Sequence, residues 1–235
     1  MNETLSSTLP RPGALPGAAG TEAVPEAAPG RASPAAPARG GVGLFLRRWA
    51  AHPLRMGSVV PSSPALCRRV VRHAWPEPGR AVLELGAGTG VMARALLGAG
   101  LGPERLAVVE IDPDLCAHLR ATLPGVTVVE GDARALPSLL PTRFRGRIGS
   151  VVCGIPLVLL PPPEQRRFID AMVAVAPGRG FLHYSYCITS PLPARRHGLS
   201  AVRRAWTPLN VPPASVWFYR PDGAESRTGA VREAA

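Results

Sequence analysis

A glycine-rich turn near the middle of the chain constrains the fold more than any other feature. The residues Glu84-Leu85-Gly86-Ala87-Gly88-Thr89-Gly90 follow an apolar strand expected at Ala81–Leu85 and precede a helix expected at Val91–Leu97. Glycine lets the backbone approach a ligand closely because it has no Cβ. In α/β sheets, ligands bind at the carboxyl ends of the strands. We therefore expect a ligand-binding loop at the end of the first strand.

Strands and helices alternate after this turn. The segments with the pattern of strands are Ala81–Leu85, Leu106–Glu110, Val126–Glu130, Arg147–Cys153, Gly180–Cys187 and two closing segments near Ala201–Trp206 and Ser215–Tyr219. The segments with the pattern of helices are Val91–Leu97, Pro113–Leu123 and Glu164–Ala176. Such alternation indicates a parallel sheet with helices on both faces, and the closing pair indicates an antiparallel edge. The sequence predicts an α/β fold with a mostly parallel, seven-stranded sheet.

Composition divides the chain into four parts. Residues 1–40 are mostly Ala, Pro and Gly without periodicity, so they cannot bury enough surface to offset chain entropy. We expect them to form a disordered tail. Residues 41–80 are expected to form N-terminal helices that cap the substrate or the membrane side, and residues 81–220 the α/β domain. Residues 221–235 are expected to be disordered.

The spacing of the glycines separates two kinds of cofactor. The dinucleotide fingerprint Gly-x-Gly-x-x-Gly fails when it is counted from Gly86, and from Gly88 only the looser form ending in Ala93 passes. The pattern Glu-x-Gly-x-Gly-x-Gly instead resembles that of the class I S-adenosylmethionine-dependent methyltransferases, whose fold is Rossmann-like. The resemblance implies that the methionine and ribose part of S-adenosylmethionine packs against Glu84, Gly86, Ala87, Gly88 and Gly90.

Three further strand ends complete the expected cofactor site. Glu110 ends the second strand, next to Ile111, and a carboxylate there can accept hydrogen bonds from both ribose hydroxyls. Asp132 and Ala133 follow the third strand, and the resemblance implies that the aspartate binds the adenine amino group. Gly154 ends the fourth strand. Strand ends in sequence order are stronger support for a cofactor site than the glycine loop alone.

The charge of the chain is concentrated on both sides of these motifs. The formal net charge is +11, and every basic residue is Arg. Residues 41–80 carry seven Arg and one Glu, net +6, and residues 151–235 carry ten Arg and five acids, net +5. Basic flanks suit an anionic surface, either nucleic acid or lipid headgroups. A short helix at residues 42–49, apolar on one side and carrying Arg47 and Arg48 on the other, is a candidate interfacial helix or a helix docked on the core.

The end of the fourth strand bears on the methyl acceptor. It reads Cys153-Gly154-Ile155-Pro156-Leu157, whereas enzymes that methylate the amine of a base carry Asn/Asp-Pro-Pro-aromatic here. The chain has neither the Asn nor the aromatic residue. A flat base substrate is therefore less favoured, both for DNA adenine methylation and for ribosomal RNA adenine dimethylation.

Several longer segments narrow the resemblance. They are residues 44–49, 53–63, the glycine loop, 154–157, 184–186 and 210–217, and the resemblance extends over residues 41 to about 220. They resemble the bacterial phospholipid N-methyltransferases of the soluble type, except that Cys153 stands where that family usually has Ser. The resemblance implies N-methylation of phosphatidylethanolamine, or of its mono- and dimethyl forms, at an anionic membrane surface. The alternatives are an enzyme like the ribosomal RNA adenine N6-dimethyltransferases, or another amine methyltransferase of small molecules.

Three residues are candidates for the catalytic site. Tyr184 and Tyr186 end the fifth strand, and alternation places both on one face of the sheet, near the transferred methyl group. Tyrosine can accept a proton or hold a methylated ammonium by cation–π attraction. Asn210 could form a wall of the headgroup pocket. Two histidines, His73 and His183, are expected to be structural.

The cysteines and the apolar segments point to a cytoplasmic enzyme. The four Cys form no Cys-x-x-Cys pair, and no His lies at zinc-ligand spacing, so we expect no metal and reduced thiols. The N-terminus has no pattern of a signal peptide. The longest apolar stretch, residues 148–160, is too short and broken to span a bilayer. We expect peripheral association with the inner face of the membrane, and the oligomeric state is left open.

Overall fold

A computed structural model describes residues 63–186, 190–208, 210 and 212–223. The predicted tail at residues 1–40 and the candidate interfacial helix at residues 42–49 lie outside the described residues, as does most of the predicted C-terminal segment.

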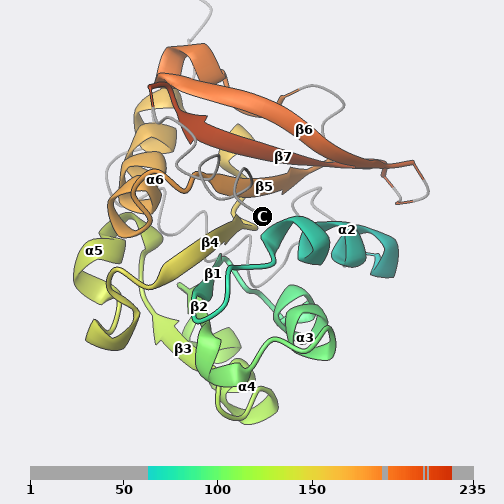
Figure 1. The fold of residues 1–235 in the computed structure, drawn as a ribbon, viewed down its shortest axis with the longest axis vertical. Helices are drawn as coiled ribbons and strands as arrows, with labels where there is room; N and C mark the ends of the chain where they lie inside the picture. The colour runs from blue at the N-terminus through green and yellow to red at the C-terminus, as the bar shows by residue number, and fades with distance from the viewer. Residues whose placement is uncertain (1–62, 187–189, 209, 211, 224–235) are drawn as a thin grey trace, which may run out of the picture. The chain divides into compact units, whose positions relative to one another are not determined.

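A seven-stranded sheet organises the described residues, in the order β3-β2-β1-β4-β5-β7-β6 (Figure 1). Its strands are β1 (Ala81–Leu85), β2 (Leu106–Glu110), β3 (Thr127–Glu130), β4 (Ile148–Cys153), β5 (Phe181–Ser185), β6 (Leu199–Thr207) and β7 (Ala214–Pro221). The first five strands are parallel, and β7 pairs antiparallel with both β5 and β6. The predicted fold class is confirmed, including the antiparallel edge formed by the last two strands.

Helices cover both faces of the sheet. The α-helices are α2 (Pro64–Ala74), α3 (Val91–Gly98), α4 (Pro113–Thr122), α5 (Leu136–Leu139) and α6 (Pro162–Val175). Short 3₁₀ helices are η1 (Pro103–Arg105), η2 (Ala133–Ala135), η3 (Thr142–Phe144), η4 (Leu157–Leu159) and η5 (Ala194–His197). One core cluster contains residues of α2, α3 and α4, and the other contains residues of α5 and α6, so each set of helices packs on its own face.

The burial of the central strands explains why apolar runs in the sequence predicted their positions. Every residue of β1 and β2 is buried, as expected for central parallel strands that are covered on both faces. Leu83 and Leu85 pack with α5 and α6, whereas Val82 packs with α2 and α3. The outer strand β6 is mostly exposed and carries Arg203 and Arg204, and charged residues of this kind protect a sheet edge from pairing with another chain.

Helix ends follow local capping rules. The Ser63 side chain accepts a hydrogen bond from the Leu66 N–H, and Pro64 occupies the first turn of α2. Asp112 caps α4 in the same way, through the N–H groups of Asp114 and Leu115. These caps satisfy backbone N–H groups in the first turns of α2 and α4.

Candidate active site

The glycine loop closes tightly over the ends of β1 and β4. The Gly86 N–H donates to the Val109 carbonyl over 2.8 Å, which ties the loop to β2. A Cβ on Gly86 would lie 2.9 Å from Ile155 Cγ1, and one on Gly90 would lie 2.8 Å from Leu119 Cδ2. Both residues also have positive φ values, of 71° and 80°, which L side chains rarely adopt. Glycine is therefore required at these two positions for a turn that brings the backbone to the ligand side of the sheet.

Glu110 fastens this loop to the neighbouring strand. One carboxylate oxygen accepts from the Gly88 N–H over 2.9 Å, and the other accepts from the N–H groups of Ile111 and Asp112 over 2.8 and 3.1 Å. Burial raises the pKa of Glu110, and these backbone hydrogen bonds oppose the rise. The sequence placed Glu110 at this edge but missed its contact with the glycine loop. Its predicted contact with the ribose hydroxyls stays a prediction.

Glu84 is the most deeply buried acid of the site. It is 1% exposed, and its Oε2 atom has no hydrogen-bond partner among the described residues. Burial, followed by the nearby charge of Glu110, raises the pKa of Glu84 to about 8. An orphaned carboxylate oxygen beside a second carboxylate is suited to a cationic ligand. S-adenosylmethionine is such a ligand, since it carries a sulfonium and an ammonium group. The buried acids and the glycine turn therefore fit this cofactor.

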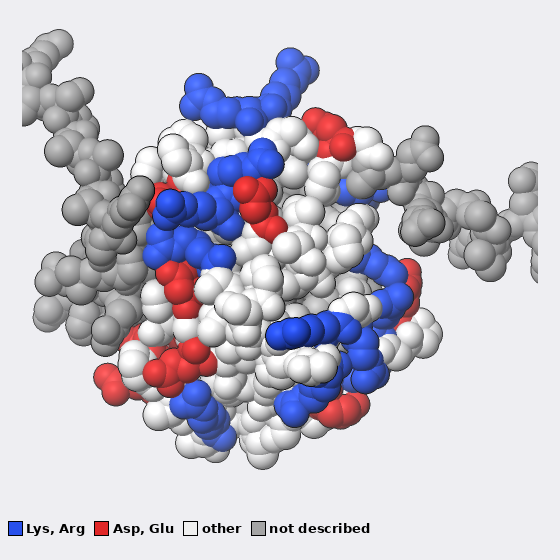
Figure 2. All heavy atoms as spheres, turned by 90° about the vertical axis from the view of Figure 1, so that its left-hand side faces the viewer, with Lys and Arg blue, Asp and Glu red and all other residues white. Residues whose placement is uncertain are grey.

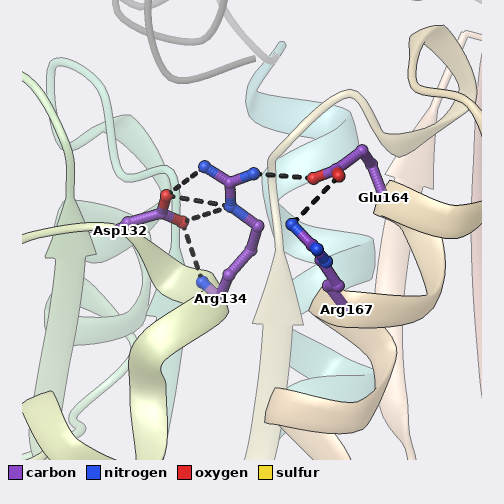
Figure 3. A network of polar contacts seen from close by, with 4 residues as sticks. All are labelled: Asp132, Arg134, Glu164 and Arg167. Carbon is purple, nitrogen blue, oxygen red and sulfur yellow. Dashed lines mark hydrogen bonds and ion pairs between the residues drawn. The ribbon is translucent and has the colours of Figure 1, made fainter. Parts of the chain in front are cut away.

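Asp132 belongs to a network of four charged side chains (Figure 3). Its carboxylate accepts from the Arg134 N–H over 2.9 Å and from the guanidinium of the same residue. The other side of that guanidinium donates to Glu164 over 2.6 Å, and Arg167 pairs with Glu164 over 3.2 Å. The hydrogen bonds to Asp132 raise the pKa of Arg134.

This network joins η2 to the first turn of α6. Ala133, the other predicted residue of this strand end, is buried in the core below it. Sequence reasoning missed Arg134 and Glu164, because they are 30 positions apart and only the fold brings them together. The predicted contact of Asp132 with adenine stays a prediction.

Tyr184 lies over the end of β4. A Cβ on Gly154 would lie 2.5 Å from the Tyr184 hydroxyl oxygen and 3.1 Å from the Gly86 carbonyl oxygen. Burial and the nearby charge of Glu84 raise the pKa of Tyr184 well above its usual range. Tyr186 packs with Tyr184 against the core cluster that contains α2. The structure thus brings Tyr184 close to Gly154, with Glu84 and Tyr186 nearby, and the catalytic roles of both tyrosines stay predictions.

Asn210 braces the connection between β6 and β7 against α2. It is buried; its Oδ1 atom accepts from the Ser63 N–H over 3.2 Å, and its Nδ2 atom donates to the Pro212 carbonyl over 2.7 Å. Both ends of the amide are thus bonded to backbone groups. This geometry assigns Asn210 a positioning role for the loop, and its predicted place in the pocket wall is untested.

The remaining polar residues have structural surroundings. His183 is buried, with Nδ1 lying 3.0 Å from the Cys153 carbonyl oxygen, and burial lowers the pKa of its imidazole to about 4.

Within the described residues, no group of three or more His, Cys, Asp or Glu is arranged to hold a metal ion. None of the helices in the described ranges has the length and apolar character needed to cross a membrane.

The chain is similar to several known proteins. A family profile described as a methyltransferase domain matches residues 82–180. An ornithine lipid N-methyltransferase from Singulisphaera acidiphila is 34% identical over 181 residues, which cover 75% of this chain and 94% of that protein. A ribosomal RNA small subunit methyltransferase A from Leptothrix cholodnii is 32% identical over 108 residues, which cover 46% of this chain and 39% of that protein.

A solved structure supports the fold. TrmN from Thermus thermophilus is similar with a TM-score of 0.50 at 19% identity, and the match covers 74% of this chain and 53% of that one. At this identity the likeness concerns the fold alone.

The sequence, the site and the relatives agree on the class of enzyme. The match to the lipid enzyme extends over nearly the whole of that protein, whereas the match to the ribosomal RNA enzyme covers 39% of its length. The predicted enzyme class and the predicted cofactor, S-adenosylmethionine, are confirmed. This chain belongs to the family of S-adenosylmethionine-dependent methyltransferases that contains the ornithine lipid N-methyltransferase of Singulisphaera acidiphila.

Proposed function

We propose that this enzyme N-methylates the headgroup amine of a membrane lipid. Phosphatidylethanolamine, with its mono- and dimethyl forms, is the first candidate, and an ornithine lipid is the second. The observation that carries the proposal is the match over 94% of a relative named as an ornithine lipid N-methyltransferase. Both candidate lipids present an aliphatic amine on a headgroup that is anchored in a bilayer by acyl chains.

The acceptor end of the site suits an aliphatic amine. The Tyr184 hydroxyl lies near Gly154 at the end of β4, and Tyr186 packs against the same core cluster. Their rings can attract an ammonium group that already carries methyl groups. The segment from Gly154 to Leu157 lacks the Asn and the aromatic residue that would clamp a flat base. These features favour a compact, tetrahedral amine over adenine.

Methyl transfer to an amine places three requirements on the protein. S-adenosylmethionine supplies the methyl group when it is bound. The protein must align the amine nitrogen, exclude water and let the ammonium lose a proton, since only the free amine has a lone pair to donate. The Tyr184 hydroxyl, which lies over Gly154, can accept a hydrogen bond from the amine and orient that lone pair. A water molecule or a carboxylate of the site takes the proton.

Ribosomal RNA adenine is the second candidate acceptor. Three ribosomal RNA methyltransferases match parts of this chain, and a net charge of +11 favours binding to a polyanion. These matches cover at most 46% of this chain and at most 39% of those proteins. The observation supports common chemistry more than a common acceptor.

A labelling experiment with three acceptors tests the proposal. The full chain is mixed with labelled S-adenosylmethionine and with vesicles of phosphatidylethanolamine and phosphatidylglycerol, vesicles that contain an ornithine lipid, or under-methylated small-subunit ribosomal RNA. We expect label in a lipid amine and none in RNA. Tyr184→Phe should lower turnover on the lipid about tenfold or more, with S-adenosylmethionine affinity unchanged. Label in RNA alone would replace the lipid proposal with the second candidate.

A further inference from the structure

A pair of exposed apolar residues lies beside the candidate active site. Helix η4 comes directly after Gly154-Ile155-Pro156, and within it Val158 is 39% exposed and Leu159 is 52% exposed. Their neighbours Leu157 and Leu160 are buried in the core on the α6 side. The backbone thus turns two large apolar side chains outward at the edge of the sheet where the methyl acceptor must arrive. We call Val158 and Leu159 the apolar tip.

The apolar tip is held in place by a buried glutamine. Gln165 Nε2 donates to the carbonyl oxygens of Leu157 and Leu160, over 3.1 and 2.9 Å, and so fixes the backbone on both sides of the tip. Its Oε1 atom lies 2.8 Å from His197 Nε2, in η5. Buried polar bonds of this kind hold one conformation. The exposure of the tip is therefore a fixed property of the fold.

Single exposed apolar residues are common on protein surfaces, so the surroundings of the tip decide its meaning. Helix η5, which Gln165 joins to the tip, carries Arg195 and Arg196 with no acidic residue. The nearby arginines of η2 and α6 are neutralised: Arg134 and Arg167 pair with Asp132 and Glu164, and Arg166 pairs with Asp170. No ion pair is recorded for Arg195 or Arg196 within the described part of the chain.

Arg195 and Arg196 of η5 therefore add positive charge near the tip that no recorded ion pair within the described residues offsets. Figure 2 shows the side on which Figure 1 draws α5 and α6, and there the arginines gather in groups with uncharged surface between them. An apolar projection flanked by uncompensated arginines matches a surface that is apolar inside and anionic outside. The interface of an anionic bilayer has this structure, whereas RNA offers phosphates without an apolar layer.

We propose that Val158 and Leu159 insert into the interfacial acyl region of an anionic bilayer while Arg195 and Arg196 contact lipid phosphates. The inference rests on the proposed lipid function and adds to it how the substrate is reached. The tip lies four and five residues beyond Gly154, so an enzyme docked in this way faces the bilayer with the acceptor end of its site. The headgroup amine then reaches the methyl group while the acyl chains stay in the membrane.

The test compares a double change in the tip with a single control change of an exposed valine elsewhere. The double variant Val158→Ser/Leu159→Ser removes the apolar tip, and Val202→Ser removes a valine that is 49% exposed on β6. Val202 pairs with Phe218, which packs against the opposite core cluster from Leu157, so the control lies on the other face of the sheet. The substrates are phosphatidylethanolamine in vesicles with phosphatidylglycerol, and a short-chain phosphatidylethanolamine below its micelle concentration.

We expect the double variant to lose vesicle binding and vesicle-dependent methylation by about tenfold or more, since two apolar side chains no longer enter the interface. Its S-adenosylmethionine affinity and its turnover of the short-chain lipid should stay within about twofold of the unchanged protein, and Val202→Ser should behave like that protein. Arg195→Gln/Arg196→Gln should weaken binding to anionic vesicles and leave binding to neutral ones unchanged.

Each contrary result has its own meaning. If the double variant binds and methylates vesicles like the unchanged protein, the insertion is overturned and the lipid function stands. If the unchanged protein labels no lipid in either form although it binds S-adenosylmethionine, the proposed function fails.

Insertion is then measured by fluorescence, with an environment-sensitive bimane attached to the cysteine of the Leu159→Cys variant. The unchanged protein, treated identically, is the control. A blue shift with anionic vesicles supports insertion without any turnover, and no shift overturns it. RNA binding that depends on the arginines but not on the tip would also overturn it.

Discussion

Glu84 combines complete burial with a carboxylate oxygen that no described group satisfies. Such a residue costs stability when it is ionised and is favourable only beside a positive charge. The same carboxylate can thus destabilise the free protein and stabilise the complex with a cationic cofactor. At the scale of single residues, the burial of Glu84 should therefore lower the stability of the free protein and favour binding of the cofactor.

Glu84→Gln should change stability and cofactor binding in opposite directions. The folded protein holds a proton on Glu84 up to a pKa of about 8, whereas the unfolded chain releases it near 4.5. Between these values stability falls as pH rises, by up to about 1.4 kcal/mol per pH unit from this group. The variant should lose that part of the slope, be more stable than the unchanged protein at pH 8, and bind S-adenosylmethionine about tenfold more weakly. Urea unfolding at pH 5, 6.5 and 8 and calorimetry measure the two effects.

Glu104→Gln is the matched control, because Glu104 is an exposed acid in η1, outside this cluster. It should leave both the pH dependence of unfolding and the cofactor affinity unchanged. An unchanged slope in Glu84→Gln would mean that Glu84 ionises in the folded protein as it does in the unfolded chain.

The sequence was informative about these residues only where local rules apply. Glu84, Glu110 and Asp132 follow apolar strands, and the carboxyl ends of parallel strands meet at one edge, so their proximity could be predicted. Which groups they bond to could not. Asp132 accepts hydrogen bonds from Arg134, and Glu110 accepts one from the Gly88 N–H. These contacts could not be predicted, because the direction of a side chain depends on tertiary packing.

Elements bounded by apolar runs were predictable, and elements defined by tertiary bonds were not. The strands β1 and β2 match their expected bounds, since every residue in them is buried. The fifth strand was expected at residues 180–187 and spans Phe181–Ser185, because pairing with β7 stops at Ser185. Helices η4 and η5 were not predicted at all. They depend on Gln165 and His197, which lie 32 positions apart.

Gln165→Ala should therefore loosen two elements at once. The change removes the donor to the Leu157 and Leu160 carbonyls and the partner of His197, all within the fold's interior. Leaving buried carbonyls unsatisfied should cost about 2–4 kcal/mol of unfolding free energy. We expect faster hydrogen exchange in residues 157–160 and 194–198, slower turnover of vesicle lipid, and S-adenosylmethionine affinity within about twofold of the unchanged protein.

Asp170→Asn is the comparison within the same helix. It breaks the exposed ion pair with Arg166, at i and i+4, which should cost less than about 0.5 kcal/mol and leave hydrogen exchange in η4 and η5 unchanged. If Gln165→Ala were no more costly than this control, the buried bonds would contribute little to holding η4, and its exposed side chains would need another explanation.

At the scale of the whole molecule, the charge pattern and the fold together bear on whether the partner surface is lipid or RNA. The basic flanks of the sequence surround a neutral middle that folds into β1 to β4 and contains the predicted cofactor site. The charge pattern alone could not say whether lipid or RNA is the partner, because both are polyanions. Helix η4 favours lipid over RNA, since its exposed Val158 and Leu159 add apolar surface that acyl chains can cover and phosphates cannot.

The dependence of vesicle binding on salt should therefore separate the contribution of the arginines from that of the apolar tip. The Debye length falls from about 10 Å at 0.1 M salt to about 3 Å at 1 M, so the contribution of the arginines to vesicle binding is screened while that of Val158 and Leu159 is not. We expect binding to vesicles with phosphatidylglycerol to weaken steeply as salt rises and then to level off. The level reached at high salt should be lower for Val158→Ser/Leu159→Ser, and the steep part should be shallower for Arg195→Gln/Arg196→Gln. Co-sedimentation from 0.05 to about 1 M salt measures both, and a curve that falls to zero in the unchanged protein would show that charge alone holds this enzyme to the membrane.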